Sequence, residues 1–359
     1  MFAIAATPGS ELPSIIEMPE PRAPGTGEIL CRTLEIGICG TDREILLSQA
    51  PLVPEGESHL VLGHECLARV EAVGSGVTEL APGNLVVPGV RRAIGRYVQR
   101  VDMLPLGTFT ERGIMYEHGF SSSLWIDRPE HLHRVDPAIA DVAVFTEPLA
   151  VVEKGANEAL LLSQARLGPG AWQAPRTLVS GQGPIGFAAI LACRARGWNV
   201  TMLGRDQPDT FRSQLALELG ADYRTLASTA AGPGDLETEG FDLVLECTGS
   251  DEVMLETARW LRGCGVMVWL GSTRIPEPAS LNVQKLMRDS LMLNHLHIGC
   301  VNAAPRDFRD ALAHLAWMKQ TSPAALAKIF TRRTSPADSL PYFTGRESQG
   351  IKTVLHYPT

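Results

Sequence analysis

Residues 177–186 have the sequence Thr-Leu-Val-Ser-Gly-Gln-Gly-Pro-Ile-Gly, a short β-rich run that ends in a Gly-x-Gly-x-x-Gly turn. Apolar residues then recur at helical spacing, so the stretch predicts a strand, a tight turn and a helix. Gly181 permits the sharp turn, Gly183 lets a pyrophosphate approach the backbone, and Gly186 lets the helix lie close to the strand. The pattern indicates the opening of a dinucleotide-binding βαβ unit, with phosphates at a helix N-terminus.

The segments that follow strengthen this interpretation, which would be weak for the motif alone in a chain with 34 glycines. Residues 198–203, 241–249 and 265–271 each have the apolar character of a strand, and helical stretches lie between them. Strands that alternate with helices predict an α/β fold with a doubly wound parallel sheet.

The first part of the chain, to about Val152, has a different pattern. Short β-type runs are separated by turns, and residues 60–74 and 84–88 are typical of antiparallel strands. We therefore expect a β-rich, barrel-like domain here. Residues 99–127 have little hydrophobic periodicity and predict a lobe or a lid. The closing strand, residues 350–356, is expected to return to this first domain.

Composition narrows the class of protein. The chain has 359 residues, 45% hydrophobic and 20% charged, which is typical of a soluble globular enzyme with two domains. Its net charge of -8 argues against a nucleic-acid or anionic-membrane partner. No apolar run is long enough to span a membrane, and residues 1–8 lack a basic signal-peptide region. Seven scattered cysteines suit free thiols, so we expect a cytoplasmic protein that binds a small molecule.

Three separated segments carry residues that a metal site would use. Cys39 and Thr41 lie in the first, His64 and Glu65 in the second, and Glu147 in the third. Thiolate, imidazole and carboxylate are the protein ligands of zinc. Taken singly, the cysteine can be a small buried hydrophobe, the histidine a hydrogen-bonded core residue, and the last carboxylate a helix N-terminal group.

Together with the nucleotide motif, these segments resemble the zinc-dependent medium-chain dehydrogenases, and most closely their glucose dehydrogenase-like branch. The matching segments are residues 37–45, 62–65, 111–120, 146–150, 181–186 and 299–302. The resemblance covers nearly the whole chain. It implies a β-rich GroES-like catalytic domain formed by residues 1–152 and 303–359, with a Rossmann domain formed by residues 153–302 between them.

The resemblance also implies roles for the candidate residues. Cys39 and His64 match the catalytic-zinc ligands, and Thr41 matches the hydroxyl that takes the proton of the substrate alcohol. Glu147 occupies a position for a metal-side or substrate-side carboxylate, and Glu65 is the adjacent carboxylate that ligates directly or through water. Zinc would lower the pKa of a bound alcohol so that hydride leaves to nicotinamide.

Cofactor choice depends on the end of the second Rossmann strand, Gly204-Arg205-Asp206. A carboxylate there binds the ribose 2′-hydroxyl of NAD, whereas a small residue followed by arginine suits the 2′-phosphate of NADP. We favour NADP over NAD. The expected cofactor-binding residues are Gly181, Gln182, Gly183, Pro184, Ile185, Gly186, Gly204, Arg205, Asp206, Thr248, Gly271, Val301 and Asn302.

Two features depart from the family pattern. Members usually carry a lobe with four cysteines around a structural zinc, but no cysteine lies between Cys66 and Cys193, so we expect one catalytic zinc and a lobe held by packing or by a partner subunit. Glu111, which resembles a sugar-hydroxyl ligand, is retained. Val90 and Asp307 stand where glucose-specific members have asparagine and histidine, so we expect a sugar-, cyclitol- or polyol-like substrate other than glucose.

Two other functions remain open from the sequence. One is a biosynthetic reductase of a ketone, imine or activated alkene, which the residues at positions 90 and 307 motivate. The other is a non-catalytic nucleotide-binding protein, against which the retained zinc-site residues argue. Relatives are commonly homodimers or homotetramers, and we expect the same here.

Overall fold

The computed structural model describes residues 1–226, 239–272, 283–345 and 347–358, and these form two compact units. The first unit comprises Met1–Glu147, Asn302–Ala316 and Phe330–Thr359, and the second Pro148–Val301 and Trp317–Ile329. The sequence placed residues 303–359 entirely with the first domain, whereas the structure groups Trp317–Ile329 with the second unit. The reason is that helix α10 (Pro323–Lys328) packs on helix α4 (Phe211–Glu218) of the second unit.

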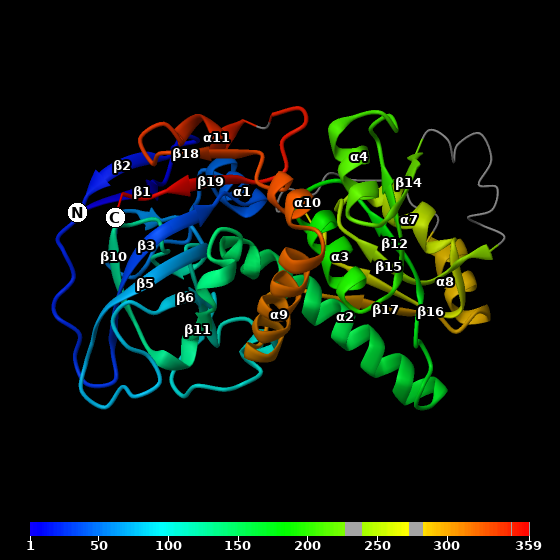
Figure 1. Ribbon diagram of the computed structural model, residues 1–359, viewed down its shortest axis with the longest axis horizontal. Coiled ribbons are helices and arrows are strands. Elements are labelled where there is room, and N and C mark those ends of the chain that lie inside the picture. The colour runs from blue at the N-terminus through cyan, green and yellow to red at the C-terminus, as the bar shows by residue number, and fades with distance from the viewer. Residues whose placement is uncertain (227–238, 273–282, 346, 359) are drawn as a thin grey trace. The chain divides into compact units, whose positions relative to one another are not determined.

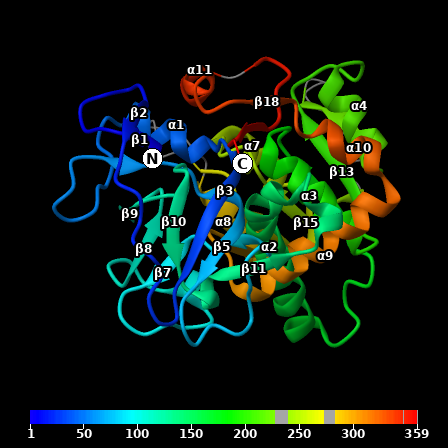
Figure 2. The same ribbon diagram turned by 60° about the vertical axis from the view of Figure 1, so that its left-hand side comes forward.

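The first unit is β-rich. Its main elements are β1 (Phe2–Ala6), β2 (Ser14–Glu17), β3 (Ile29–Gly37), α1 (Gly40–Leu47), β4 (Leu60–Val61), β5 (Glu65–Val73), β6 (Leu85–Pro88), β7 (Arg91–Ala93), β8 (Phe109–Arg112), β9 (Tyr116–Glu117), β10 (Leu124–Asp127), β11 (Leu132–Val135), β18 (Arg332–Thr334), α11 (Leu340–Thr344) and β19 (Thr353–His356). The largest sheet has the order β11-β6-β5-β3-β19-β18, with β10 also paired to β3. Strands β3 and β5 run antiparallel side by side (Figure 2).

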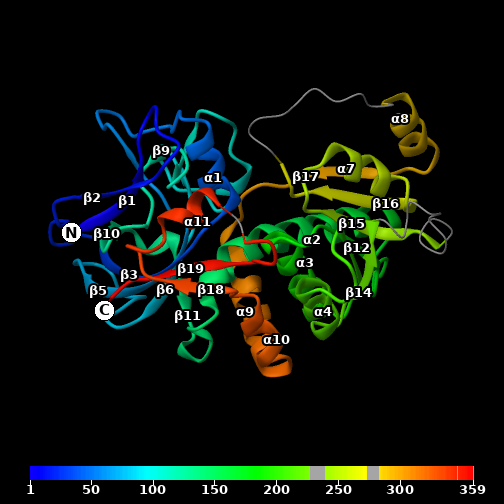
Figure 3. The same cartoon turned by 90° about the horizontal axis from the view of Figure 1, so that it is seen from above.

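The C-terminal strand completes this sheet. Strand β19 pairs antiparallel with β3, with Val354 opposite Gly37, so the end of the chain returns to the first unit as expected. Both termini lie in this unit (Figure 3). A core of buried apolar side chains, which includes Ile36, Phe120 and Leu355, lies between the sheets and drives their association.

The second unit contains a parallel sheet. Its elements are β12 (Arg176–Ser180), α3 (Pro184–Ala195), β13 (Asn199–Gly204), α4, β14 (Asp222–Thr225), β15 (Phe241–Glu246), α7 (Asp251–Ala258), β16 (Leu261–Trp269), α8 (Val283–Met292) and β17 (Leu296–Gly299), together with most of α2 (Thr146–Leu167), the end of α9 (Pro305–Thr321) and α10. The six strands follow the order β14-β13-β12-β15-β16-β17 (Figure 1). All neighbours are parallel, so the topology is the Rossmann arrangement predicted from the sequence.

Within the described residues, no helix is both long enough and apolar enough to cross a bilayer.

Ion pairs hold the lobe, which we define as residues 88–114 of the first unit. Arg92 lies 2.7 Å from the carboxylate of Asp127 on β10, and both side chains are buried. The guanidinium of Arg112 is 3.9 Å from the same carboxylate and 4.6 Å from the ring centre of Phe120. Burial raises the pKa of Asp127, but the two arginines outweigh it and hold that pKa below its usual value. Charge pairing therefore fixes the base of the lobe.

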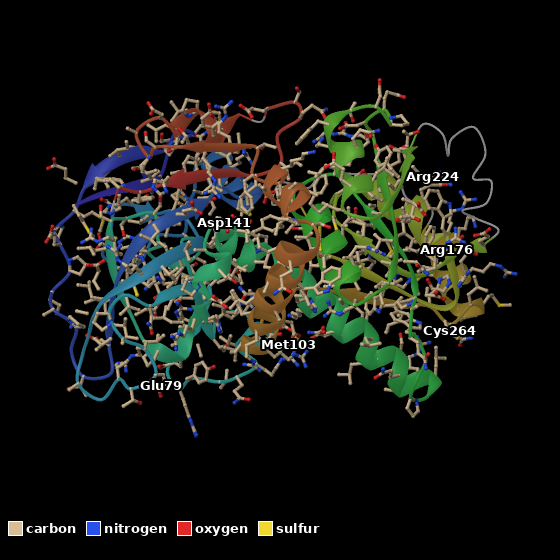
Figure 4. All side chains as sticks on the ribbon, in the orientation of Figure 1. Glu79, Met103, Asp141, Arg176, Arg224 and Cys264 are labelled. Carbon is tan, nitrogen blue, oxygen red and sulfur yellow. The ribbon has the colours of Figure 1, made fainter. Side chains whose placement is uncertain are left out.

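The far end of the lobe is apolar and exposed. Met103 (labelled in Figure 4) and Leu106 have 59% and 86% of their surface accessible.

Candidate active site

Cys39, His64 and Glu65 meet in the first unit. Their candidate ligand atoms lie within 4.8 Å of one another. The pairing of β3 with β5 places Gly37 opposite Glu65, so Cys39 at the end of one strand comes next to His64 at the start of the other. Thiol, imidazole and carboxylate together form a donor set that fits Zn²⁺.

Asp42 orients this cluster, and sequence reasoning missed it. Its carboxylate is fully buried, accepts the backbone N–H of Cys39 at 2.9 Å and lies 3.5 Å from the His64 ring. Burial lowers the pKa of His64, but the charges of Asp42 and Cys39 outweigh it, so the pKa rises well above its usual value. A carboxylate behind a metal-binding imidazole fixes the orientation of the ring. The Cys-x-x-Asp spacing at a helix start was the available signal, because it matches a capping box.

Lys352 neutralises Glu65 and was also missed. Its side chain is fully buried, pairs with the Glu65 carboxylate and donates to the Ile38 carbonyl at 3.1 Å. A lysine inside the apolar strand region 350–356 was the sequence signal, because a buried ammonium needs a partner.

The other two candidate catalytic residues lie outside the ligand cluster. Thr41 is half-buried in the first turn of α1. Glu147, in the first turn of α2, is buried, and burial raises its pKa to about 7, with the charge of Glu65 adding to the effect and that of His64 opposing it. Its carboxylate is not among the three groups that meet at 4.8 Å.

The candidate substrate residues have three different environments. Glu111 is buried, lies 3.0 Å from Arg91 and accepts a hydrogen bond from the Asn302 side chain at 2.9 Å. Val90 is buried and apolar. Asp307 is fully buried, and its carboxylate accepts the Ala304 N–H at 2.9 Å at the start of α9. Asp307 thus caps a helix, whereas Glu111 is held by Arg91 and Asn302.

The glycine turn of the second unit has the shape expected from its sequence. Gly181 adopts a φ of +105°, which disfavours any side chain. A Cβ on Gly186 would lie 2.0 Å from the Gly181 carbonyl oxygen, so only glycine allows this close approach of helix α3 to strand β12. The N-terminus of α3 follows directly, with Gly183 as its N-cap residue.

The end of β13 shows how the candidate cofactor residues interact. The Asp206 backbone N–H donates to the Gln182 side chain at 3.2 Å. Arg212 donates to both oxygens of the Asp206 carboxylate, at 2.7 and 2.8 Å. The side chain of Thr248, after β15, pairs with buried Glu246, and a Cβ on Gly271 would lie 2.2 Å from the Gly249 nitrogen. The carboxylate of Asp206 is therefore charge-paired within the chain.

A second group of metal-type side chains is less suited to a metal. Glu57, His59 and His118 also lie within 4.8 Å of one another. The Val61 N–H donates to the Nδ1 atom of His118 at 3.2 Å, so the neutral ring carries its proton on Nε2. A protonated nitrogen has no lone pair for a metal.

Comparison with known proteins extends these findings. The family described as "Glucose dehydrogenase C-terminus" matches residues 140–357, and the "Alcohol dehydrogenase GroES-like domain" matches residues 25–121. The chain is 35% identical over 357 residues, 99% of both chains, to glucose 1-dehydrogenase 2 of Vulcanisaeta moutnovskia. It is 39% identical over 317 residues, 88% of both chains, to glucose 1-dehydrogenase of Thermoproteus tenax.

Solved structures show the same fold. Glucose dehydrogenase of Haloferax mediterranei, in complex with NADP, Zn and gluconolactone, is 28% identical and superposes with a TM-score of 0.87 over 100% of both chains. The 2R,3R-butanediol dehydrogenase of Bacillus subtilis, at 20% identity, has a TM-score of 0.82 over 100% of this chain and 99% of that one.

Proposed function

Because the chain belongs to the zinc-dependent medium-chain dehydrogenases, in their glucose dehydrogenase-like group, we propose that it transfers hydride between NAD(P) and a secondary alcohol of a sugar, cyclitol or polyol. The observation that carries this proposal is the meeting of Cys39, His64 and Glu65. A Rossmann sheet with its glycine turn supplies the nucleotide site in the second unit.

The residues of the first unit have distinct roles in this reaction. Cys39, His64 and Glu65 would hold the zinc ion, which when bound supplies Lewis-acid polarisation of the substrate oxygen. The hydroxyl of Thr41 would accept a hydrogen bond from the alcohol and relay its proton onward to solvent. Asp42 orients His64 through its buried carboxylate, and Lys352 balances the charge of Glu65. Glu147 supplies a further carboxylate on the metal or substrate side.

The proposed substrate class rests on Glu111. A carboxylate held in place by Arg91 and Asn302 is a suitable acceptor for sugar or polyol hydroxyls. The relatives named glucose 1-dehydrogenase support a carbohydrate-like substrate. Val90 and Asp307 add no such acceptor, which favours a substrate other than glucose.

We propose NADP as the preferred nucleotide and a single, catalytic zinc. The pairing of Asp206 with Arg212 supports NADP, because a carboxylate occupied on both oxygens is a poorer acceptor for the ribose hydroxyls of NAD. Arg205 supplies a positive charge for a 2′-phosphate. The cysteine-free lobe, held by Arg92 and Asp127, supports the absence of a structural zinc.

We also propose a homodimer or homotetramer in the cytoplasm. Strand β17 is the last in the sheet order of the described residues. Helix α8, which precedes it in the chain (Figure 3), exposes Met287 and Leu291, with 63% and 74% of their surface accessible. Seven cysteines, none of them in a disulfide within the described residues, suit a reducing compartment. Light scattering coupled to size-exclusion chromatography measures the assembly directly, and a monomer at micromolar concentration would contradict it.

Elemental analysis and nucleotide titration test the central proposal. We expect about one zinc per chain in the wild type and in C264A, a cysteine outside the cluster, and loss of that zinc in C39A. NADPH should bind more tightly than NADH by fluorescence titration. A substrate panel of aldoses, cyclitols, polyols, ketones and imines then identifies the reaction, and turnover of ketones or imines alone would favour the biosynthetic reductase instead. Full activity in zinc-free protein would refute the zinc mechanism.

A further inference from the structure

Lys154 is a buried charge that the proposed reaction does not use. It lies on helix α2, only 2% of its surface is accessible, and its Nζ atom donates to the backbone carbonyl of Val301 at 2.9 Å. Removing an ammonium group from water is costly unless the group is paired. An apolar residue would fill this place with less cost, so packing alone does not account for a lysine.

The carbonyl that Lys154 holds belongs to a junction in the chain. Val301 is the last residue of its segment in the second unit, and Asn302 is the first residue of the next segment in the first unit. Asn302 has a φ of +60°, in the left-handed region that asparagine adopts more readily than most residues with a side chain. Its side chain accepts the Ala303 N–H at 2.9 Å and donates to Glu111. Specific contacts therefore maintain this conformation.

Helix α2 contacts the same segment at a second point. The Cys300 thiol lies 3.4 Å from the Val151 carbonyl, and a Cβ on Gly155 would meet the Val268 side chain at 3.0 Å. The helix is thus packed closely against the strands that lead to Val301, and Lys154 reaches its carbonyl from a fixed backbone.

The contact determines which way the next amide points. The described residues contain no cis peptide bond, and in a trans peptide the N–H points opposite to the C=O. By holding the Val301 carbonyl, Lys154 directs the Asn302 N–H to the other side of the peptide. No hydrogen bond from either the Val301 or the Asn302 N–H is found within the described residues, so both amides remain available to a ligand.

We propose that Lys154 is a positioning residue of the nucleotide site. By holding the Val301 carbonyl it fixes the Val301–Asn302 peptide, so that the Asn302 N–H of this peptide, beside the Val301 N–H of the preceding one, receives the carboxamide of the nicotinamide end of NAD(P). The proposal rests on the proposed function, because these two residues contact nicotinamide only in an NAD(P)-dependent enzyme. Lys154 acts through the backbone and touches neither substrate nor reacting atoms.

Three variants test this role. K154M removes the amine and keeps most of the apolar stem, and K154R keeps a cationic donor. R196M is the matched control, because Arg196 forms a buried ion pair with Glu153, the neighbour of Lys154 on α2. If K154M fails to fold, K154Q replaces it, since its shorter neutral side chain also removes the ammonium.

Two measurements separate positioning from general stability. Hydrogen exchange of the peptide that covers residues 299–304 should be faster in K154M than in the wild type and unchanged in R196M. The Kd and KM for NADPH should rise about tenfold in K154M, as expected for loss of one charge-assisted hydrogen bond. The kcat at saturating nucleotide should change less than about threefold, because only binding is lost. K154R should restore most of the affinity.

The outcomes distinguish the two proposals. Wild-type exchange in K154M, or an equal rise in nucleotide KM in R196M, would overturn the role of Lys154. Wild type that binds neither NADPH nor NADH would overturn the proposed function, and the nucleotide role of Lys154 with it. Wild type that binds nucleotide with the same affinity as K154M would leave the function standing and refute Lys154 alone.

Discussion

The Cys39–His64–Glu65 cluster and the lobe of residues 88–114 both bury charged groups in the first unit, but with opposite character. At the cluster, the Cys39 thiol, the His64 ring and the Glu65 carboxylate bring potential metal-donor atoms within 4.8 Å of one another. At the lobe, the buried side-chain atoms without a hydrogen-bond partner among the described residues are the Nε atoms of Arg92 and Arg112, which are hydrogen-bond donors. The cluster therefore offers donor atoms to a bound cation, whereas the lobe contains cationic arginine side chains that pair with a buried carboxylate. A family lobe that usually holds zinc can thus be stabilised by arginine–aspartate pairs.

The largest expected effect is loss of catalysis on removing a ligand from the cluster. C39A should lower kcat/KM by about 1000-fold or more, because the Lewis acid supplies several kcal/mol of transition-state stabilisation. Thermal unfolding should change far less than in the lobe variants described next. Kinetics with added zinc and a melting curve check this. Activity of C39A close to that of the wild type would show that catalysis does not depend on the cluster.

The lobe should respond in the opposite way. R92M leaves the buried carboxylate of Asp127 without its 2.7 Å partner, so we expect a destabilisation of about 3–5 kcal/mol with zinc content retained. The double variant R92M/D127L removes both charges and should recover much of the loss. Denaturant unfolding measures both variants. Equal loss in the single and double variants would show that packing, not charge pairing, holds the lobe.

A smaller effect is expected behind the metal ligands. D42N preserves the shape of the side chain that contacts His64 and the Cys39 N–H but removes its charge. Zinc affinity should fall by about 10- to 100-fold, the usual range for outer-shell groups. Competition with a chelator measures this change. The control is E79Q, which alters an exposed acid elsewhere in the unit and should leave zinc affinity unchanged.

Acid sensitivity should mark strand β11, which pairs with β6 next to the lobe. Burial lowers the pKa of His133, which stacks on Phe308 at 4.4 Å, to about 3. The native state then binds fewer protons than the unfolded state between about pH 3 and the ordinary histidine pKa near 6.5, so stability falls as the pH drops through this window. H133F should remove about 1–2 kcal/mol of the loss between pH 7 and pH 5. Unfolding curves of H133F and the wild type at pH 7 and pH 5 measure this difference. An equal loss of stability in the two proteins would contradict the assignment of the acid sensitivity to His133.

Much of the fold follows from local sequence. The glycine turn of residues 181–186, with apolar strands and helices in alternation, specifies the Rossmann sheet because each local preference agrees with the final topology. The irregular pattern of residues 99–127 predicted a lobe or a lid, but it did not reveal that strands β8, β9 and β10 lie in this stretch and that β10 pairs with β3. Strand and turn patterns also predicted the β-rich first domain, and the family resemblance added the domain bounds and the roles of the candidate zinc and nucleotide residues.

Only tertiary structure could show which charges compensate one another. Asp42, Lys352 and Lys154 carry no strong motif, since each gains its role from a partner far along the chain or from burial. Likewise, sequence could say that the lobe lacks cysteines, but not that Arg92 and Arg112 would meet Asp127. Local propensity depends on neighbours within a few residues, whereas the pairing of buried charges depends on how sheets and helices pack, which no single segment encodes.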